Sequence, residues 1–279
     1  MTSGLHLWGR RSVSPTRRSA RRPLARRRVP RAAALALLLV SATACSADEW
    51  KRAGMPVGVT KQAETVQSLW NGSWIAALAT GVVVWGLILW SAAFHRKRKN
   101  SKEELPPQVR YNLPIEILYT VVPIIMVGVF FYFTARDETY IDKMSGKPDV
   151  KVKVEAFQWS WRFTTDYNGK QVQTVGRPVS DYTDGPQLWL PAGKKVEFEL
   201  QSPDVIHSFW VPAFHFKRDV IPGVVNRFEV DTLNVDKPTV LAGRCAELCG
   251  VDHSRMLFSV KLVPQAEFDQ YVASQAGAQ

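Results

Sequence analysis

The chain has 279 residues, of which 36 are Lys or Arg and 25 are Asp or Glu, and its formal net charge is +11. Ten of the basic residues are arginines between positions 10 and 31, where no acidic residue occurs, so the rest of the chain carries 26 basic and 25 acidic residues. This balance excludes a nucleic-acid-binding body, and the length allows one or two domains.

The arginine run leads directly into an apolar run from Ala32 to Val40, which small residues follow. This order is typical of a secretory signal peptide rather than a nucleic-acid arm, and we expect the signal peptide to span residues 1–44. The segment Ala42–Cys45 reads Ala-Thr-Ala-Cys and looks like a bacterial lipobox, although Leu is usual where Ala42 stands. We therefore expect Cys45 to be lipidated and to begin the mature chain.

Two apolar runs predict a transmembrane helical hairpin over residues 70–136. Polar residues 45–69 precede it and indicate an extracytoplasmic linker or a short amphipathic helix. Trp74–Phe94 is free of charged residues and is about 31 Å long as a helix, which is enough to cross a bilayer. The basic cluster His95–Lys99 follows and stays in the cytoplasm by the positive-inside rule. Leu113–Ala135 then returns the chain to the outer face.

Glu116 lies near the cytoplasmic end of the second run. An ionisable group there is costly unless it reaches the interface, pairs or serves a proton path. Position alone favours a carboxylate that reaches the interface from the end of the helix.

Residues 149–265 change to an alternation of apolar and polar residues with frequent turn signals, which predicts an antiparallel Greek-key sandwich. Residues 266–279 form a C-terminal tail, and a short helix is expected from Pro264 to Ser274. Trp159, Trp161 and Phe163 would share one face of a strand, and the last two are expected in the core. The expected strands are Val150–Phe157, Trp161–Thr165, Gln171–Val175, Lys195–Leu200, Arg227–Val230, Thr239–Ala242 and Leu257–Leu262.

The segment Cys245–Met256 reads CAELCGVDHSRM and contains two thiols, an imidazole and a thioether. These are soft-metal ligands, so the segment indicates copper or zinc. A blue copper site uses one Cys, whereas two cysteines suit two metals bridged by two sulfurs. Outside the cytoplasm the two thiols could instead form a disulfide, but that leaves His253 and Met256 without a role. His207 is the upstream candidate for a further ligand.

This segment resembles the copper loop of the cytochrome c oxidase subunit II family, whose pattern is Cys-[Ser/Ala]-Glu-[Ile/Leu]-Cys-Gly-x-x-His-Ser-x-Met. Every fixed position is present. The resemblance implies a cupredoxin-like domain that holds a dinuclear copper centre, CuA. It implies bridging thiolates from Cys245 and Cys249, terminal ligands from His207 and His253, a weak ligand from Met256, and the backbone carbonyl of Glu247. The Glu247 carboxylate would help hold Mg at the boundary with subunit I.

Two other segments resemble the same family. Gln158–Trp161 is similar to the family's Gln-Trp-x-Trp, in which the first Trp accepts electrons from cytochrome c, and this implies that role for Trp159. The segment from Glu116 to Pro123 is similar to Glu-x-x-[Trp/Tyr]-Thr-x-x-Pro, in which the Glu stands at the mouth of a proton channel. His215 has no such support and is interpreted as incidental.

The resemblance implies a multi-pass subunit of a bacterial cytoplasmic membrane, with both termini and the copper domain outside. Its partners would be oxidase subunits I and III and either cytochrome c or the cytochrome c of a bc1-type complex; nucleic acid is not expected. Oxygen reduction would occur in subunit I. The alternative is a free-standing, membrane-anchored cupredoxin that carries electrons or delivers copper, against which Glu116 and the second span argue.

Overall fold

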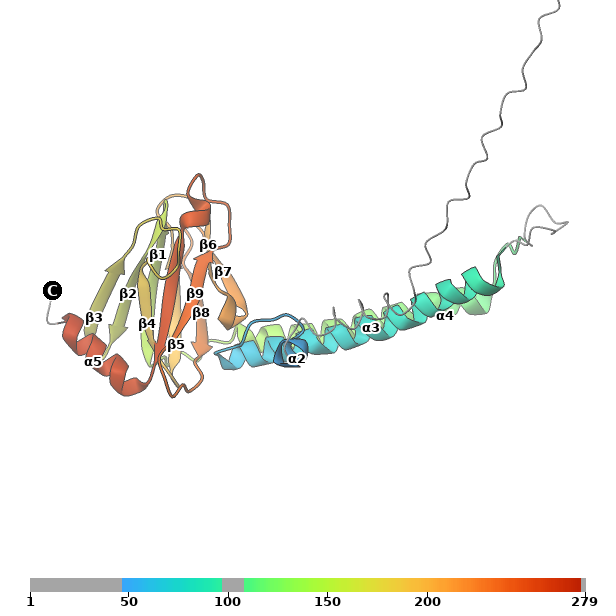
Figure 1. The fold of residues 1–279 in the computed structure, drawn as a ribbon, viewed down its shortest axis with the longest axis horizontal. Helices are drawn as coiled ribbons and strands as arrows, with labels where there is room; N and C mark the ends of the chain where they lie inside the picture. The colour runs from blue at the N-terminus through green and yellow to red at the C-terminus, as the bar shows by residue number, and fades with distance from the viewer. Residues whose placement is uncertain (1–46, 97–107, 277–279) are drawn as a thin grey trace, which may run out of the picture. The chain divides into compact units, whose positions relative to one another are not determined.

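The structure is a computed structural model that describes residues 47–96 and 108–276, so the predicted signal peptide and Cys45 lie outside the described residues. Two long helices precede a β-domain, and a C-terminal helix follows it (Figure 1). The elements are α2 (Ala47–Arg52), α3 (Lys61–Phe94), α4 (Leu113–Ile141), β1 (Val150–Phe157), β2 (Ser160–Tyr167), β3 (Lys170–Val175), β4 (Gln187–Pro191), β5 (Lys195–Gln201), β6 (His207–Val211), β7 (Phe216–Val220), β8 (Asn226–Asp231), β9 (Thr239–Cys245), β10 (Leu257–Val263) and α5 (Gln265–Ala276).

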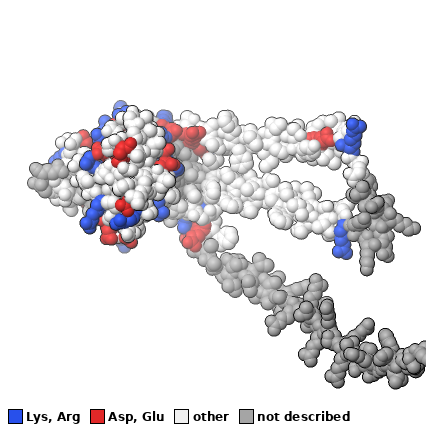
Figure 2. Space-filling view, turned by 90° about the horizontal axis from the view of Figure 1, so that it is seen from above, with Lys and Arg blue, Asp and Glu red and all other residues white. Residues whose placement is uncertain are grey.

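Helices α3 and α4 are each long and apolar enough to cross a membrane, and no residue of their most apolar segments is buried. Figure 2 shows white surface along both helices, with coloured side chains near their ends. Thr60 caps the start of α3 by accepting a hydrogen bond from the Ala63 N–H. The 34 residues of α3 would extend about 51 Å, whereas the hydrocarbon core is about 30 Å thick. The first turns of α3 therefore lie beyond the span predicted from Trp74.

The β-domain is a sandwich of two five-stranded sheets with the orders β3-β2-β1-β5-β8 and β4-β10-β9-β6-β7. The predicted fold class, a helical hairpin followed by a cupredoxin-like sandwich, is confirmed. The expectation of a purely antiparallel sandwich was wrong, because β1 pairs with β5 and β4 pairs with β10 in parallel. Parallel neighbours need a crossover connection, and both connections here pass through strands of the other sheet.

An aromatic core fills the space between the sheets. Trp161 stacks on Phe163, and the Trp161 ring also meets the rings of Phe209 and Phe258 edge to face. These four side chains are at most 1% exposed, which confirms the core assignment of Trp161 and Phe163. Trp159, however, precedes β2 and lies in the turn after β1, so it does not share a strand face with them.

Three strands of the second sheet were not predicted. β4, β6 and β7 have only five residues each, which is short for a reliable pattern. In β6 four of the five side chains are buried, because both faces are covered, and the period-2 alternation disappears. His207, the upstream candidate ligand, therefore begins a strand that the sequence pattern did not predict.

Residues 56–63, which we call the strap, run into the first turn of α3 and connect the helix to the sandwich. The Val59 N–H donates to the Ala213 carbonyl, and the Leu233 N–H donates to the Val59 carbonyl. His215, which was interpreted as incidental, lies against the strap: its Nδ1 is 3.0 Å from the Ala63 carbonyl oxygen and its Nε2 is 2.9 Å from that of Pro56. His215 thus has a structural role that its neighbours in sequence do not reveal.

We predict that Gly243→Ala destabilises the sandwich. Gly243 lies opposite Phe258 across β9 and β10, and an added Cβ would be 2.1 Å from a Phe258 ring carbon. Overpacking of this kind costs about 1–3 kcal/mol. Calorimetry of the full-length protein should give a lower melting temperature for Gly243→Ala, and the control Val240→Ala, an exposed position in the same strand, should melt close to the parent protein. Equal melting temperatures for the two variants would contradict this packing.

Candidate metal centre

The candidate centre is built on the connection between β9 and β10. Cys245 ends β9, a short 3-10 turn covers His253–Arg255, and Met256 directly precedes β10. His207 is supplied by β6, which pairs with β9 so that Phe209 lies opposite Cys245. One short loop and one neighbouring strand therefore bring together ligands that are far apart in sequence.

The two cysteines are free thiols, and both are buried. Their sulfur atoms are 3.9 Å apart, whereas a disulfide bond is about 2.05 Å long. The two sulfurs are therefore not joined as the disulfide alternative requires, and both are available to a metal.

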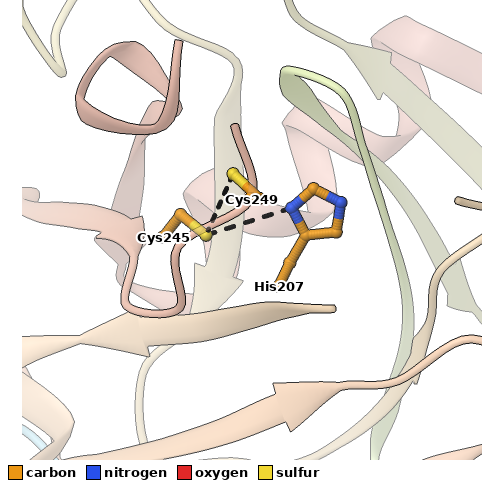
Figure 3. Close-up of side chains that lie close together, drawn as sticks. All are labelled: His207, Cys245 and Cys249. Atoms are coloured by element: carbon orange, nitrogen blue, oxygen red, sulfur yellow. Dashed lines mark hydrogen bonds between the residues drawn. The ribbon is translucent and has the colours of Figure 1, made fainter. Parts of the chain in front are cut away.

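An imidazole lies beside each thiol. The His207 Nδ1 is 4.0 Å from the Cys245 Sγ, and the His253 Nδ1 is 3.5 Å from the Cys249 Sγ. The ligand atoms of His207, Cys245 and Cys249 all lie within 4.8 Å of one another. Figure 3 shows the His207 ring directed toward the two sulfurs. These donors fit copper, which accepts both thiolate and imidazole ligands.

Weaker donors complete the cluster. The Met256 Sδ is 3.8 Å from the Cys249 Sγ, and the Glu247 carbonyl oxygen is 3.2 Å from the Cys245 Sγ. Met256 is fully buried although it lies at the end of a loop. The structure thus brings side-chain or backbone donors of all six predicted ligand residues into one cluster.

Asp204 fixes the orientation of the His207 ring. Its Oδ1 is 2.9 Å from the His207 Nε2, which leaves Nδ1 directed at the sulfurs. A carboxylate on the outer nitrogen is a common way to set the tautomer of a metal-binding His. Burial would raise the pKa of Asp204, but hydrogen bonds with His207 and with the Gln158 and Val205 amides outweigh it, so the pKa lies below its ordinary value.

The ionisation of the metal-free site is asymmetric. Burial would raise the pKa of the Cys245 thiol, but hydrogen bonding with His207 and with the backbone at Ser208 and Glu247 lowers it to about 7. Burial and the neighbouring Cys245 raise the pKa of Cys249 to about 12. Burial would lower the pKa of His207, but Cys245 and Asp204 raise it above its ordinary value. The first thiolate therefore forms at Cys245, the thiol beside His207.

Trp159 lies directly on the metal loop. Its indole N–H donates to the Cys249 carbonyl at 3.1 Å, and the Gln158 side-chain amide donates to the same oxygen at 2.9 Å. Gly250 permits this approach, because a Cβ there would be 2.9 Å from the indole nitrogen and its φ is +125°. The sequence singled out Trp159 but gave no role to Gln158, whose signal was its place as the first residue of the Gln-Trp-x-Trp motif.

The remaining predicted residues lie apart from the thiols. The Glu247 carboxylate faces Lys217, with 3.5 Å between Oε1 and Nζ. Glu116 is in the first turn of α4, where its Oε1 accepts a hydrogen bond from the N–H of the capping residue Asn112 at 2.9 Å. This capping contact was not foreseen in the sequence.

Comparisons with known proteins show which family this chain resembles. Residues 150–263 match the family model described as cytochrome C oxidase subunit II, periplasmic domain. The probable cytochrome c oxidase subunit 2 of Streptomyces coelicolor is 48% identical, over 91% of this chain and 88% of that protein. The cytochrome c oxidase subunit 2 of Mycobacterium tuberculosis is 36% identical, over 88% of this chain and 81% of that protein. The solved periplasmic domain of subunit II from Bradyrhizobium japonicum is 28% identical, covers 48% of this chain and 99% of that domain, and has a TM-score of 0.43.

We predict that the metal-free protein forms its first thiolate with a midpoint near pH 7, because the pKa of Cys245 is lowered to about 7. Thiolate absorbance during a pH titration under reducing conditions measures this step. His207→Ala removes the hydrogen bond that lowers the pKa, so the midpoint should rise by about one pH unit or more.

His215→Ala is the control for this titration, because His215 contacts the strap rather than the thiols. Its midpoint should equal that of the parent protein. A His207→Ala variant that also titrates near pH 7 would mean that His207 does not set the ionisation of Cys245.

Proposed function

Because the chain belongs to the cytochrome c oxidase subunit II family, we propose that it is the electron-input subunit of a haem-copper oxidase. A dinuclear copper (CuA) centre, when bound, supplies a one-electron carrier between cytochrome c and haem in subunit I, where oxygen is reduced and protons are pumped. This chain provides the ligands, the contact with the donor and the membrane anchor.

The single observation that carries the proposal is the gathering of two free thiols and two imidazoles in one cluster, in which both thiols and His207 are buried and His253 is partly exposed. Cys245 and Cys249 would supply the thiolate ligands of the copper pair, and His207 and His253 would supply its imidazole ligands. The Met256 thioether and the Glu247 carbonyl would be the weak ligands. Zinc would use the same donors, but it has no redox chemistry and could not carry the electron that the family's role requires.

Hydrogen bonds from the surrounding residues fix the positions of the ligands. Asp204 holds the His207 ring through Nε2, and the same carboxylate accepts the Gln158 N–H at 2.7 Å. Gln158 and Trp159 both hold the Cys249 carbonyl. Ligands that are fixed from outside move little when charge changes, and little movement favours fast electron transfer. Burial of the thiols excludes water from the same space.

Trp159 is the proposed point of contact with the donor. Its ring is partly exposed, while its N–H reaches the backbone of the ligand Cys249. The Trp159 ring therefore connects the protein surface to the Cys249 sulfur through one hydrogen bond and the covalent bonds of Cys249.

We further propose the arrangement of the chain in the membrane. Residues 1–44 are the signal peptide, Cys45 carries lipid, and residues 45–69, 149–265 and 266–279 lie outside a bacterial cytoplasmic membrane. Residues 70–136 form the hairpin, with the turn between the spans in the cytoplasm. The partners are subunits I and III and cytochrome c, free or within a bc1-type complex. To bind Mg at the subunit I boundary, the Glu247 carboxylate would have to give up its ion pair with Lys217 and contact the metal instead.

Trp159→Phe in the assembled oxidase should slow oxidation of cytochrome c by up to about 100-fold, as for other losses of a positioned contact. The reason is that Phe keeps a ring but lacks the N–H that reaches Cys249. The copper content and optical spectrum should stay unchanged, which separates lost transfer from lost metal. Trp189→Phe is the matched control, since Trp189 stacks on Tyr271 away from the loop. Unchanged turnover in Trp159→Phe would refute the assignment.

Glu116→Gln tests the proposed proton-path role. The Gln carbonyl can still accept the Asn112 N–H that Glu116 accepts now, so the helix cap is kept while the acid is lost. We expect slower proton uptake and turnover with unchanged electron input to the copper domain. Glu116→Ala, which loses both features, shows the separate effect of the cap. If Glu116→Gln behaves like the parent protein, capping is the whole role of this carboxylate.

A further inference from the structure

Helix α2 is attached to α3 by an unusual set of contacts. Three side chains of α3, those of Gln67, Trp70 and Asn71, donate hydrogen bonds to the carbonyls of Arg52, Ala53 and Lys51. The donor–acceptor distances are 3.0, 3.0 and 3.1 Å, respectively. The last carbonyls of a helix lack partners within it, so α3 caps the C-terminal end of α2. Figure 1 shows α2 beside α3.

These contacts fix the level of α2 along α3. The donors lie just before the mostly apolar stretch that begins at Trp74, and the Trp70 and Trp74 rings meet edge to face at 5.8 Å. Trp50 lies next to the capped residues of α2 and is 64% exposed. Three tryptophans, Trp50, Trp70 and Trp74, therefore gather at one level of the hairpin; we call them the tryptophan cluster.

The spacing of two aromatic pairs along α3 matches the distance between the two boundaries of a bilayer. Trp90 and Phe94 form a second aromatic pair, with ring centroids 4.3 Å apart, directly before the basic cluster after Phe94. Trp70 and Trp90 are twenty residues apart, which corresponds to about 30 Å of helix and to the thickness of the hydrocarbon core. Trp is enriched at both membrane–water interfaces, because its ring is apolar and its N–H is polar.

From this arrangement we propose that α2 and the tryptophan cluster form a docking surface for the phospholipid headgroup layer on the side of the membrane that faces the sandwich. The surface is continuous with the exposed apolar sides of α3 and α4, which anchor the chain. Trp50 contacts the lipid with its exposed ring, while the capped carbonyls of α2 need no water. The side chains of Asp48 and Lys51, which are 74% and 78% exposed, remain in the polar headgroup layer.

This surface would hold the strap at a fixed distance from the membrane. The strap begins four residues after Arg52 and ends in the first turn of α3. Lipid contact at α2 would therefore restrain one end of the segment that ties α3 to the sandwich through Ala213 and Leu233.

Photo-crosslinking in native membranes tests the proposal. p-Benzoylphenylalanine replaces Trp50 in the full-length protein, and mass spectrometry identifies adducts that depend on irradiation. The matched control carries the probe at Val57, which is 61% exposed but belongs to the strap. Leu87, which is 65% exposed within the apolar part of α3, is the positive control for lipid contact.

We expect a phospholipid adduct at position 50 and at position 87, and none at position 57. Removing the caps with Gln67→Ala and Asn71→Ala should reduce the adduct at position 50 and leave that at position 87 unchanged. The proposal is overturned if position 50 crosslinks to a polypeptide, or gives no phospholipid adduct while position 87 does. A phospholipid adduct at position 57 would also overturn it, because the headgroup layer would then extend past the assigned boundary.

Discussion

The pairing of β6 with β9 brings the imidazole of His207 to the sulfur of Cys245, and the other features of the site are arranged around that contact. Phe209 and Trp210 of β6 lie opposite Cys245 and Arg244 of β9. The register is held by the aromatic core, since Phe209 stacks on Phe258 of β10. A shift of one residue would turn His207 to the other face of the sheet and would separate the ligand from the loop.

The carboxylate of Asp204 extends this constraint to the surface. The carboxylate accepts a hydrogen bond from the Gln158 N–H and lies within hydrogen-bonding distance of the His207 Nε2. The side chains of Gln158 and Trp159 are held against the metal loop, because both donate to the Cys249 carbonyl. Trp159, the His207 imidazole and the Cys249 backbone are therefore parts of a single hydrogen-bonded unit. At the other end of the sandwich, the strap and His215 join the same domain to α3.

Much of this organisation could be predicted from the sequence. The two spans follow from length and apolarity, and the metal loop follows from ligand types that are local in the chain. The two-sided burial of β6 removed the alternation that would have marked it as a strand, so the element that supplies His207 could not be found by pattern. Contacts between distant residues, such as Gln158 with Cys249 and His215 with Pro56, depend on the fold and have no local signal. The capping contact between Asn112 and Glu116 is local, and attention to helix start signals would have found it.

We propose that two thiols and two imidazoles of this chain would hold a pair of coppers that share one electron. Electron paramagnetic resonance of the copper-loaded full-length protein tests it most directly. An electron shared equally by two copper nuclei gives a seven-line hyperfine pattern, and this is the result we predict, together with two coppers per chain by elemental analysis. A four-line pattern with one copper per chain would indicate a mononuclear site and would contradict the account.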